Sequence, residues 1–423
     1  MAGKRLFGLL FVLGTVLYAC GSACALTVEE EIAGLKARIE QLEARISRQD
    51  AVPADREELE DSLRMIQEAF DGLTIGAGAT FIVQGTSHAN GDDLSANGED
   101  VIDASYSVDL ELEKAFDDYA TAFVHLETGD GAGVEDELKV FSGVNRDADD
   151  SDNSVSLTEV WYEQYLKSVP VTLTFGKLDP TAYIDTNEYA NDECTQFLGR
   201  IFRNSPVIEF PDNSGGLRLS VAPAEAVDLE VIALDADSDW EDVFDGMFIA
   251  GQVNIKPDIL GHAGNYRLVA WYSDREHTEW MDMADTTKSA YGAGISVDQE
   301  LTDVLGIFAR YGWQDPDVFL NGDAFSLEQA WSIGMQCSGQ LWGRDEDVAG
   351  VGFGQVIPSD EYKKANNLRA DSEEHIELYY AYKVNGHLTL TPDLQIILDP
   401  YGNDAANGDK TIVVGGMRGQ VDF

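Results

Sequence analysis

The segment HIELYYAYKVNGHLTLTPDLQIIL, residues 375–398, alternates between apolar and polar side chains around a central Asn385-Gly386 pair. Apolar residues such as Leu378 and polar residues such as Glu377 take opposite parities along it. Period-two alternation indicates β-strands, and Asn-Gly favours a type I′ turn because both of its central positions need a positive φ. The segment therefore predicts a long β-hairpin whose apolar face meets either a folded core or lipid.

The same alternation recurs along the rest of the chain and predicts sixteen strands of about ten residues each. No comparable helical period occurs after Gly72. The predicted strands are residues 73–85, 104–116, 119–127, 155–166, 171–178, 216–223, 227–236, 246–256, 264–275, 289–298, 305–314, 327–338, 348–357, 374–384, 388–398 and 411–423.

The connections between these strands alternate between short and long. Asp117-Asp118 is short, whereas residues 86–103, 128–154 and 179–214 are long and rich in Asp, Asn, Gly and Ser. Short turns at one end, long loops at the other and an even strand count are typical of outer-membrane barrels. A closed barrel also satisfies every backbone hydrogen bond and leaves no strand edge in the hydrocarbon.

We therefore predict an all-β transmembrane barrel of sixteen antiparallel strands with up-and-down topology, formed by residues 72–423. Its apolar face meets lipid in the outer membrane of a Gram-negative bacterium. The chain ends on Phe423, in register with Val421. A terminal aromatic strand of this kind resembles the signal that the outer-membrane insertion machinery reads. A soluble β-sandwich shares the alternation but has no reason to place every long loop at one end.

Two segments precede the predicted barrel. Lys4 and Arg5, a following apolar run and an A-x-A pattern at residues 23–25 predict a signal peptide of residues 1–25. Residues 26–71 are predicted to be a periplasmic coiled-coil or helical segment, because apolar residues recur there at heptad spacing. These residues are Val28, Ile32, Leu35, Ile39, Leu42 and Ile46.

The heptads favour an oligomerising stalk, and we expect a homotrimer. Two alternatives stay open: a helix that lies on its own barrel, and a tether between the outer membrane and the cell wall.

The formal net charge of −49 excludes nucleic acid as a partner, because phosphate binding needs clusters of Lys and Arg. Removal of the signal peptide leaves Cys194 and Cys337, either as two unpaired residues or as one bridge. The 6 histidines show no metal-ligand spacing in the sequence and no nucleophile beside them. We expect no cofactor and no enzymatic activity.

Residues 235–239 (DADSD) resemble the start of a calcium loop. However, Trp240 replaces the glycine of the sharp turn, and Gly246 replaces the final glutamate. Non-specific binding of divalent cations by acidic external loops is the expectation that remains.

Residues 174–211, TFGKLDPTAYIDTNEYANDECTQFLGRIFRNSPVIEFP, resemble the OprB-type carbohydrate-selective porins. WYEQYL at 161–166 and LTPDLQIILD at 390–399 also resemble this family. Ser205 stands where the family pattern leads us to expect a second Asn. The resemblance covers residues 72–423 and implies a sixteen-stranded barrel through which sugars diffuse.

The longest predicted loop follows the fifth strand, where a porin folds a segment inward to narrow its lumen. Asn and carboxylate groups hydrogen-bond sugar hydroxyls, and aromatic faces cover ring C–H groups. Arginine forks on inward strand positions bind vicinal hydroxyls and, opposite carboxylates, polarise a constriction. The predicted constriction and substrate contacts are Asp185, Asn187, Tyr189, Asn191, Asp192, Gln196 and Phe197 on the loop, and Arg218, Glu230, Arg267, Trp271, Arg310 and Arg418 on the wall.

The alternative interpretation is that these arginines only neutralise acids of the lumen. Taken together, the sequence predicts a passive porin for sugars and similar small hydrophilic solutes. The alternative functions are a general cation-preferring porin and a barrel that mainly tethers the membrane.

Overall fold

The structure is a computed structural model that describes residues 36–39, 70–91, 100–148, 153–241, 246–405, 408 and 410–423. The chain divides into two compact units, Met1–Asp71 and Gly72–Phe423. Residues 36–39 are helical, but the predicted signal peptide and most of the heptad segment lie outside the described residues. Among the described residues, no helix is both long and apolar enough to cross a membrane.

The second unit is an antiparallel barrel, built from one sheet of 18 strands. β9 (Asp258–Ile259) and β13 (Val318–Leu320) are short additions, which leaves sixteen long strands (18 − 2) in the described part of the chain. The long strands are β1 (Leu73–Ser87), β2 (Ile102–Asp117), β3 (Ala120–Asp130), β4 (Ser156–Leu166), β5 (Val171–Leu178), β6 (Ser214–Ala224), β7 (Val227–Asp235), β8 (Met247–Ile255), β10 (His262–Glu279), β11 (Lys288–Thr302), β12 (Leu305–Gln314), β14 (Leu327–Ser338), β15 (Val348–Pro358), β16 (Glu373–Asn385), β17 (Leu388–Leu398) and β18 (Ile412–Asp422).

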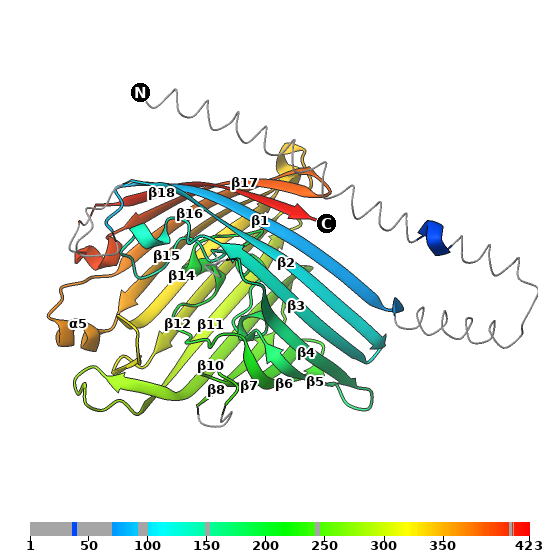
Figure 1. Ribbon diagram of the computed structural model, residues 1–423, viewed down its shortest axis with the longest axis horizontal. Helices are drawn as coiled ribbons and strands as arrows, with labels where there is room; N and C mark the ends of the chain where they lie inside the picture. Colours follow the sequence, from blue (N-terminus) through cyan, green and yellow to red (C-terminus); the bar gives the residue numbers. More distant parts are fainter. Residues whose placement is uncertain are drawn as a thin grey trace, which may run out of the picture. The chain divides into compact units, whose positions relative to one another are not determined.

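Successive long strands pair with each other, and β1 pairs with β18 to close the barrel (Figure 1). Gly78 lies opposite Asp422 and Ser87 lies opposite Val413 in this closing pair. The predicted sixteen-stranded antiparallel barrel is confirmed. The helices among the described residues of the second unit are one-turn or two-turn elements in the connections: η1 (Glu135–Glu137), η2 (Pro180–Ala182), α4 (Arg200–Arg203), η3 (Gly339–Trp342), α5 (Asp360–Asn366) and η4 (Pro400–Asn403).

The predicted hairpin of residues 375–398 is present as β16 and β17, but its turn differs from the prediction. Asn385 pairs with Leu388, so Gly386 and His387 are the two turn residues. Neither of them, nor Asn385, has a positive φ, and the predicted type I′ turn is therefore wrong. The Asn385 side chain accepts hydrogen bonds from the backbone N–H groups of His387 and Leu388 instead, at 2.8 and 3.1 Å. A side-chain turn of this kind needs no left-handed residue.

The two parities of this hairpin face opposite sides of the wall. Leu378 and Leu394 are 43% and 40% exposed, whereas Glu377 and Gln395 are 1% and 2% exposed. The apolar side chains therefore point out of the barrel, and the polar side chains point inward, where loop segments cover them. This inverted burial suits a barrel in lipid, because lipid replaces the core that a soluble sheet would need.

The long connections and the short turns lie at opposite ends of the barrel, as predicted, with one exception. The β14–β15 connection belongs to the short-turn end but spans residues 339–347 and contains η3. Parts of two long connections, residues 131–148 and 179–213, fold back against the inner wall. We call them the first and the second inward loop, and they organise the candidate site.

Candidate functional site

The second inward loop follows β5 and packs against glycines of the opposite wall. At Gly306 in β12, an added Cβ would lie 2.0 Å from Tyr189 Cζ of the loop. At Gly352 in β15, it would lie 2.6 Å from the ring of Phe202. The missing side chains therefore let large loop residues approach the strands closely. Glycine on an inward strand position is a signal for such packing that sequence reasoning did not use.

A buried ion pair joins this loop to β12. Arg310 Nε lies 3.2 Å from Asp185 Oδ2, and both residues are nearly inaccessible to solvent. The Arg310 guanidinium also donates hydrogen bonds to the carbonyl oxygens of Phe202 and Ala190, each at 2.7 Å. Burial raises the pKa of Asp185, against the opposing effect of Arg310 and of the Ser205 N–H at 2.7 Å. The Arg310 guanidinium thus anchors the loop at the Asp185 side chain and at two main-chain carbonyl groups of the loop.

Two more charged wall residues hold the main chain of the same loop. Arg418 in β18 donates hydrogen bonds to the carbonyl oxygens of Glu193 and Gln196, at 2.6 and 2.9 Å. Glu377 in β16 accepts hydrogen bonds from the N–H groups of Leu198 and Gly199, at 2.6 and 2.9 Å. The sequence analysis predicted Arg418 as a site residue. It did not predict Glu377, which was identified only as a polar residue of the hairpin.

The amides and acids that the sequence assigned to sugar contact mostly stabilise the loop itself. Asn187 Nδ2 donates to Ser296 Oγ at 3.2 Å. Gln196 Oε1 accepts from the N–H groups of Asn191 and Asp192, at 2.6 and 3.2 Å. Asp192 in turn accepts from the N–H groups of the next residues, Cys194 and Thr195.

Phe197 is buried among three other aromatic rings, those of Phe202, Phe308 and Tyr379. Ring centroids in this cluster lie 4.9 to 5.5 Å from that of Phe197. This cluster fixes the middle of the second inward loop rather than leaving Phe197 at a free surface.

Arg218 differs from the other three predicted arginines because its partners stay partly open. Arg267, Arg310 and Arg418 are 7%, 4% and 1% exposed, and Arg267 pairs with Asp298 of the neighbouring strand. Arg218 lies between Glu163 of β4, at 3.2 Å, and Glu230 of β7. Its guanidinium carbon lies 4.3 Å from the ring centre of Tyr183 in the second inward loop.

We call Glu163, Tyr183, Arg218 and Glu230 the Arg218 patch. The side chains of Glu163 and Glu230 are 32% and 14% exposed to solvent. Trp271, the remaining predicted wall residue, is buried beside Gly292, where an added Cβ would lie 2.5 Å from its Nε1. The patch therefore combines an aromatic face, a guanidinium fork and two carboxylates on one side of the second inward loop.

The first inward loop was not predicted to enter the barrel. Its Val144 carbonyl accepts a hydrogen bond from Gln395 of β17 at 2.8 Å. Glu373 of β16 accepts from the N–H of Phe141 at 2.9 Å. Glu135 forms an ion pair with Arg200 of the second inward loop at 3.1 Å. The two loops thus pack on each other as well as on the wall.

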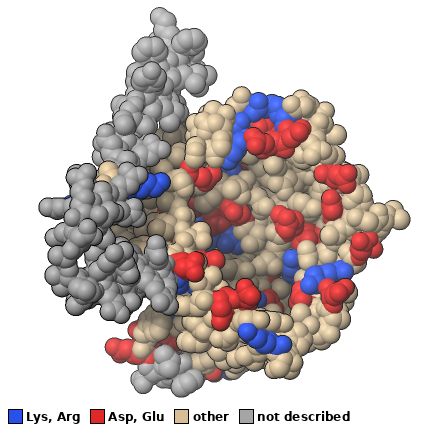
Figure 2. Space-filling model, turned by 90° about the vertical axis from the view of Figure 1, so that its right-hand side faces the viewer, with Lys and Arg blue, Asp and Glu red and all other residues tan. Residues whose placement is uncertain are grey.

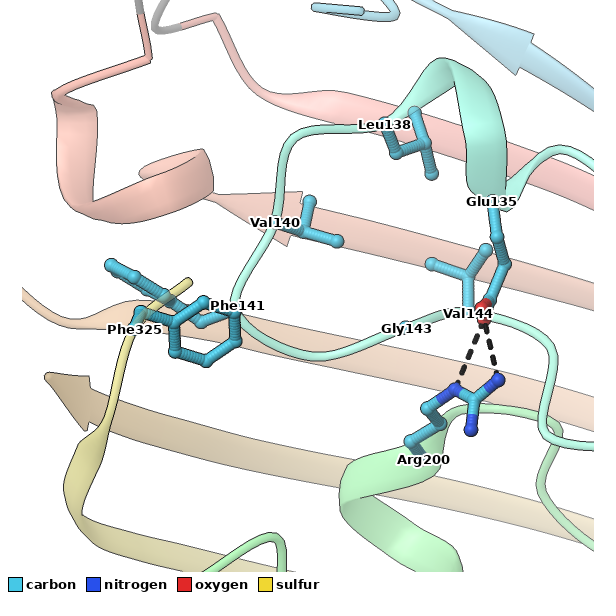
Figure 3. A pocket seen from close by; sticks show the side chains of 8 residues that line it. All are labelled: Glu135, Leu138, Val140, Phe141, Gly143, Val144, Arg200 and Phe325. Atoms are coloured by element: carbon cyan, nitrogen blue, oxygen red, sulfur yellow. Dashed lines mark hydrogen bonds and ion pairs between the residues drawn. The ribbon is translucent and has the colours of Figure 1, made fainter. Parts of the chain in front are cut away.

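A pocket of about 270 Å³ lies beside this contact (Figure 3). Apolar side chains of the first inward loop and Phe325 line it, and the Glu135–Arg200 pair closes one side. The pocket is small and mainly apolar, which does not suit a polar solute.

Carboxylates are concentrated on the inward parity of β2, β3, β4 and β7. Outward residues such as Leu110 alternate with them and are exposed. Figure 2 shows acidic and basic side chains around and within a hollowed face at the right-hand end of Figure 1, which carries the short turns. We call the inward carboxylates of β2, β3, β4 and β7 the acidic wall: Asp109, Glu111, Glu113, Glu127, Glu159, Glu163, Asp228 and Glu230.

Cys194 and Cys337 are both free thiols, so the possible bridge between them is absent. The Cys194 thiol donates a hydrogen bond to Asp147 Oδ1 at 3.3 Å, and Ser107 Oγ donates to the same oxygen at 3.1 Å. Burial raises the pKa of Asp147 from 3.8 to about 7, although these two hydrogen bonds lower it. This carboxyl group connects the two inward loops to β2.

The calcium-like stretch does bring three acids together. The carboxylates of Asp235, Asp237 and Asp239 lie within 4.8 Å of one another. Two of the three are exposed, as is common for acidic loops, so the cluster adds nothing to the expectation of non-specific cation binding.

Residues 99–423 match the family described as "Carbohydrate-selective porin, OprB family". A protein of Aquifex aeolicus is 27% identical over 229 residues, which are 53% of this chain and 58% of that protein. A protein of Chlamydia abortus described as "Porin AaxA" is 21% identical over 290 residues, or 67% of this chain and 61% of that protein. The chain therefore spans about three fifths of the length of the curated relatives it matches.

The fold is similar to that of OprB from Pseudomonas putida. The high-pH structure of that protein matches with a TM-score of 0.70 and 18% identity, covering 85% of this chain and 96% of that one. The low-pH structure matches with a TM-score of 0.51 and 17% identity, over 86% and 96%.

Proposed function

Because the chain belongs to the OprB family of carbohydrate-selective porins, we propose that it lets sugars and similar small hydrophilic solutes diffuse passively through its barrel. It is an outer-membrane porin and not an enzyme. The observation that supports a sugar path is the Arg218 patch. Tyr183 offers a ring face for sugar C–H groups, and the Arg218 fork with its flanking carboxylates offers partners for hydroxyls.

In this proposal the predicted site residues, together with Tyr183, divide into two groups. Arg310, Arg418 and Asp185 hold the second inward loop in the lumen, and Arg267 neutralises Asp298. Arg218, Glu230 and Tyr183 meet the solute. The constriction is therefore set by buried anchors, whereas contact with sugar falls to the half-open patch beside them.

Single-channel recording in planar bilayers tests the proposal. Neutral sugars added to the bath should reduce the ion current in a concentration-dependent way, because a sugar held in the lumen excludes ions. Polyethylene glycols of matched size serve as the control for simple obstruction. If no sugar reduces the current more than the matched glycol does, the channel has no sugar site and the proposal fails.

The acidic wall favours a second candidate function, a general cation-preferring channel. Fixed carboxylates along a lumen attract cations and repel anions, and the field is stronger in a narrow pore than on an open surface. Reversal potentials in a salt gradient measure this preference. The E111Q/E113Q variant should lower it, whereas D118N/E225Q removes two carboxylates from short turns and should change it much less.

We also propose that the chain forms a homotrimer and that residues 26–71 lie in the periplasm as a coiled-coil segment. The heptad spacing of Val28, Ile32 and Leu35 supports this assignment. Cross-linking of the full chain and of a chain that lacks residues 28–70 tests it. The truncated chain should still assemble but lose its oligomer at lower detergent stress.

A further inference from the structure

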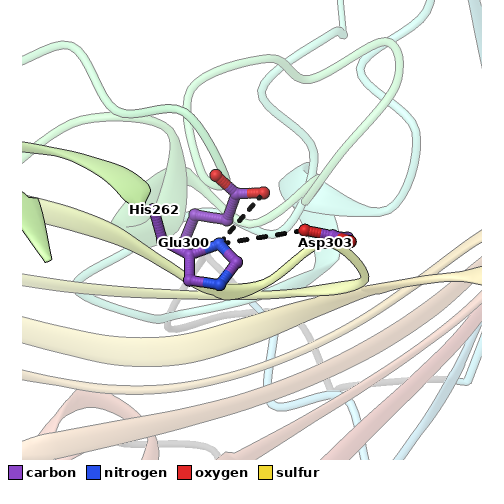
Figure 4. Close-up of side chains that lie close together, drawn as sticks. All are labelled: His262, Glu300 and Asp303. Carbon is purple, nitrogen blue, oxygen red and sulfur yellow. Dashed lines mark ion pairs between the residues drawn. The ribbon is translucent and has the colours of Figure 1, made fainter. Parts of the chain in front are cut away.

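Three side chains with metal-ligand atoms converge at the short-turn end of the barrel (Figure 4). His262 begins β10, Glu300 lies near the end of β11, and Asp303 lies in the turn before β12. His262 Nδ1 is 3.7 Å from Glu300 Oε1 and 4.0 Å from Asp303 Oδ1. The histidine is far from both acids in the sequence, so ligand spacing could not reveal the group.

The backbone that carries two of these residues is held by one buried amide. Gln299 Nε2 donates to the carbonyl oxygens of His262, Ala263 and Glu300, at 3.1, 3.1 and 2.8 Å. Its Oε1 accepts a hydrogen bond from the Tyr266 hydroxyl at 3.1 Å. The strands are thereby fixed before any ligand arrives, and only the ends of three side chains need to move.

The electrostatic surroundings leave the two carboxylates available. In the described part of the chain, the ion pairs of Glu300 and Asp303 both go to His262 and not to Lys or Arg. Two carboxylates beside an imidazole supply one nitrogen and two oxygen donors. Ca²⁺ and Mg²⁺ prefer oxygen-only sets, whereas Zn²⁺ and similar ions accept imidazole together with carboxylate.

The distances fit such an ion after a small closure. Bonds of about 2.0–2.1 Å in a tetrahedral zinc site separate neighbouring donor atoms by about 3.3 Å. The observed 3.7 and 4.0 Å exceed this separation by less than one ångström. Rotation of the exposed Asp303 and the half-exposed Glu300 side chains can supply that difference.

We propose that His262, Glu300 and Asp303 bind a divalent transition-metal ion of the Zn²⁺ class, with water completing its coordination. The site goes beyond solute passage and stands whether or not sugars are the solute. It lies close to the second inward loop, because Glu300 pairs with Gly306, whose Cα faces the Tyr189 ring. A bound dication would therefore add positive charge beside the constriction and reduce the entry of cations.

Isothermal titration of the purified full chain in detergent, with ZnCl₂ alone as the probe, tests the site. The unaltered protein should show one saturable Zn²⁺ site per chain above the weak background of acidic loops. H262A should weaken this binding by roughly tenfold or more, since loss of even a supporting group near a metal costs that much. Ca²⁺ titrations should not distinguish the two proteins.

Two matched variants control the experiment. H387A removes a histidine from another short turn, and a D235N/D237N/D239N variant removes the other acidic cluster. Both should keep the saturable Zn²⁺ site. Equal Zn²⁺ affinity of H262A, H387A and the unaltered protein would overturn the proposal.

A second readout needs no variant. Co²⁺ bound to the unaltered protein in a four-coordinate site with one nitrogen ligand should give visible absorption far more intense than that of Co²⁺ in water, and Zn²⁺ should abolish it. A spectrum identical to that of aqueous Co²⁺ at saturating metal would also overturn the proposal.

Discussion

The Arg310 guanidinium and the Asp185 carboxylate form a buried ion pair, with 3.2 Å between Nε and Oδ2, that fastens the second inward loop to β12. R310A leaves Asp185 buried without its counter-charge, which costs about 3–5 kcal/mol in comparable pairs. We expect the loop to detach while the strands stay paired, so the mean single-channel conductance and its fluctuations should both rise. Planar-bilayer recording measures both quantities.

R344A is the control for this change, because it breaks an Arg–Asp pair with Asp347 in the β14–β15 connection, outside the inward loops. Its conductance should match that of the unaltered protein. The double variant D185N/R310M should destabilise the loop less than R310A does, because it leaves no unpaired buried charge. A conductance of R310A equal to that of R344A would show that the loop is held without this pair.

The close packing of the second inward loop on wall glycines should not tolerate an added methyl group. G306A places a methyl group where the Tyr189 ring now lies, 2.0 Å from Cζ, so the ring must move. Overpacking of this kind costs about 1–3 kcal/mol. We expect faster proteolysis within residues 179–213 than in the unaltered protein. G415A is the matched control, since nothing lies within 4 Å of its added Cβ.

Asp147 should make the packing of the two inward loops depend on pH. Burial raises its pKa to about 7, so the folded state favours the neutral carboxyl group. A raised folded-state pKa gives a stabilising contribution that is complete below the ordinary value of 3.8 and is lost as the pH rises through about 7. The loops should therefore resist proteases better at about pH 5 than at about pH 8.5.

The D147N variant keeps the neutral form at every pH and should remove most of this difference. Limited proteolysis of the unaltered protein and the variant across the pH range provides the comparison. A pH dependence that persists in D147N would assign the effect to another group.

The strands could be predicted from the sequence because their alternation is local information. The predicted bounds 171–178, 305–314, 327–338 and 388–398 coincide with β5, β12, β14 and β17. β10 exceeds its predicted bounds at both ends. Its final residues pair with β13, where His277 lies opposite Leu320, and local alternation carries no signal for that extension.

The interior of the barrel could be predicted only in part, because it depends on residues far apart in the chain. Parity identified Arg310 and Arg418 as inward residues, but their carbonyl partners lie more than a hundred residues away in a loop without periodicity. The same holds for Glu377 and for the whole first inward loop. The turn after Asn385 was wrongly predicted although the signal was local. The Asn-Gly pair favours a type I′ turn, but side-chain hydrogen bonds of Asn385 form a different turn.

The Arg218 patch carries the sharpest functional prediction. R218A removes the fork that lies over Tyr183 and between Glu163 and Glu230. Neutral sugars should then block the current less, by about tenfold in half-blocking concentration if one charge-assisted hydrogen bond of about 1.4 kcal/mol is lost. Cation preference should rise as well, because two lumen carboxylates lose their counter-charge. Blocking titrations and reversal potentials measure the two effects separately.

Two variants distinguish contact from charge. K256A removes one positive charge next to Asp228, just after the end of β8 and outside the Arg218 patch. It should shift the reversal potential toward cations, as R218A does, but leave the sugar block unchanged. R218K keeps the charge and loses the planar fork, so its reversal potential should stay close to that of the unaltered protein while its sugar block weakens. If sugars block the current of R218A and R218K as strongly as that of K256A, the sugar path does not include the Arg218 patch. The acidic wall with its cation preference then becomes the better account of this channel.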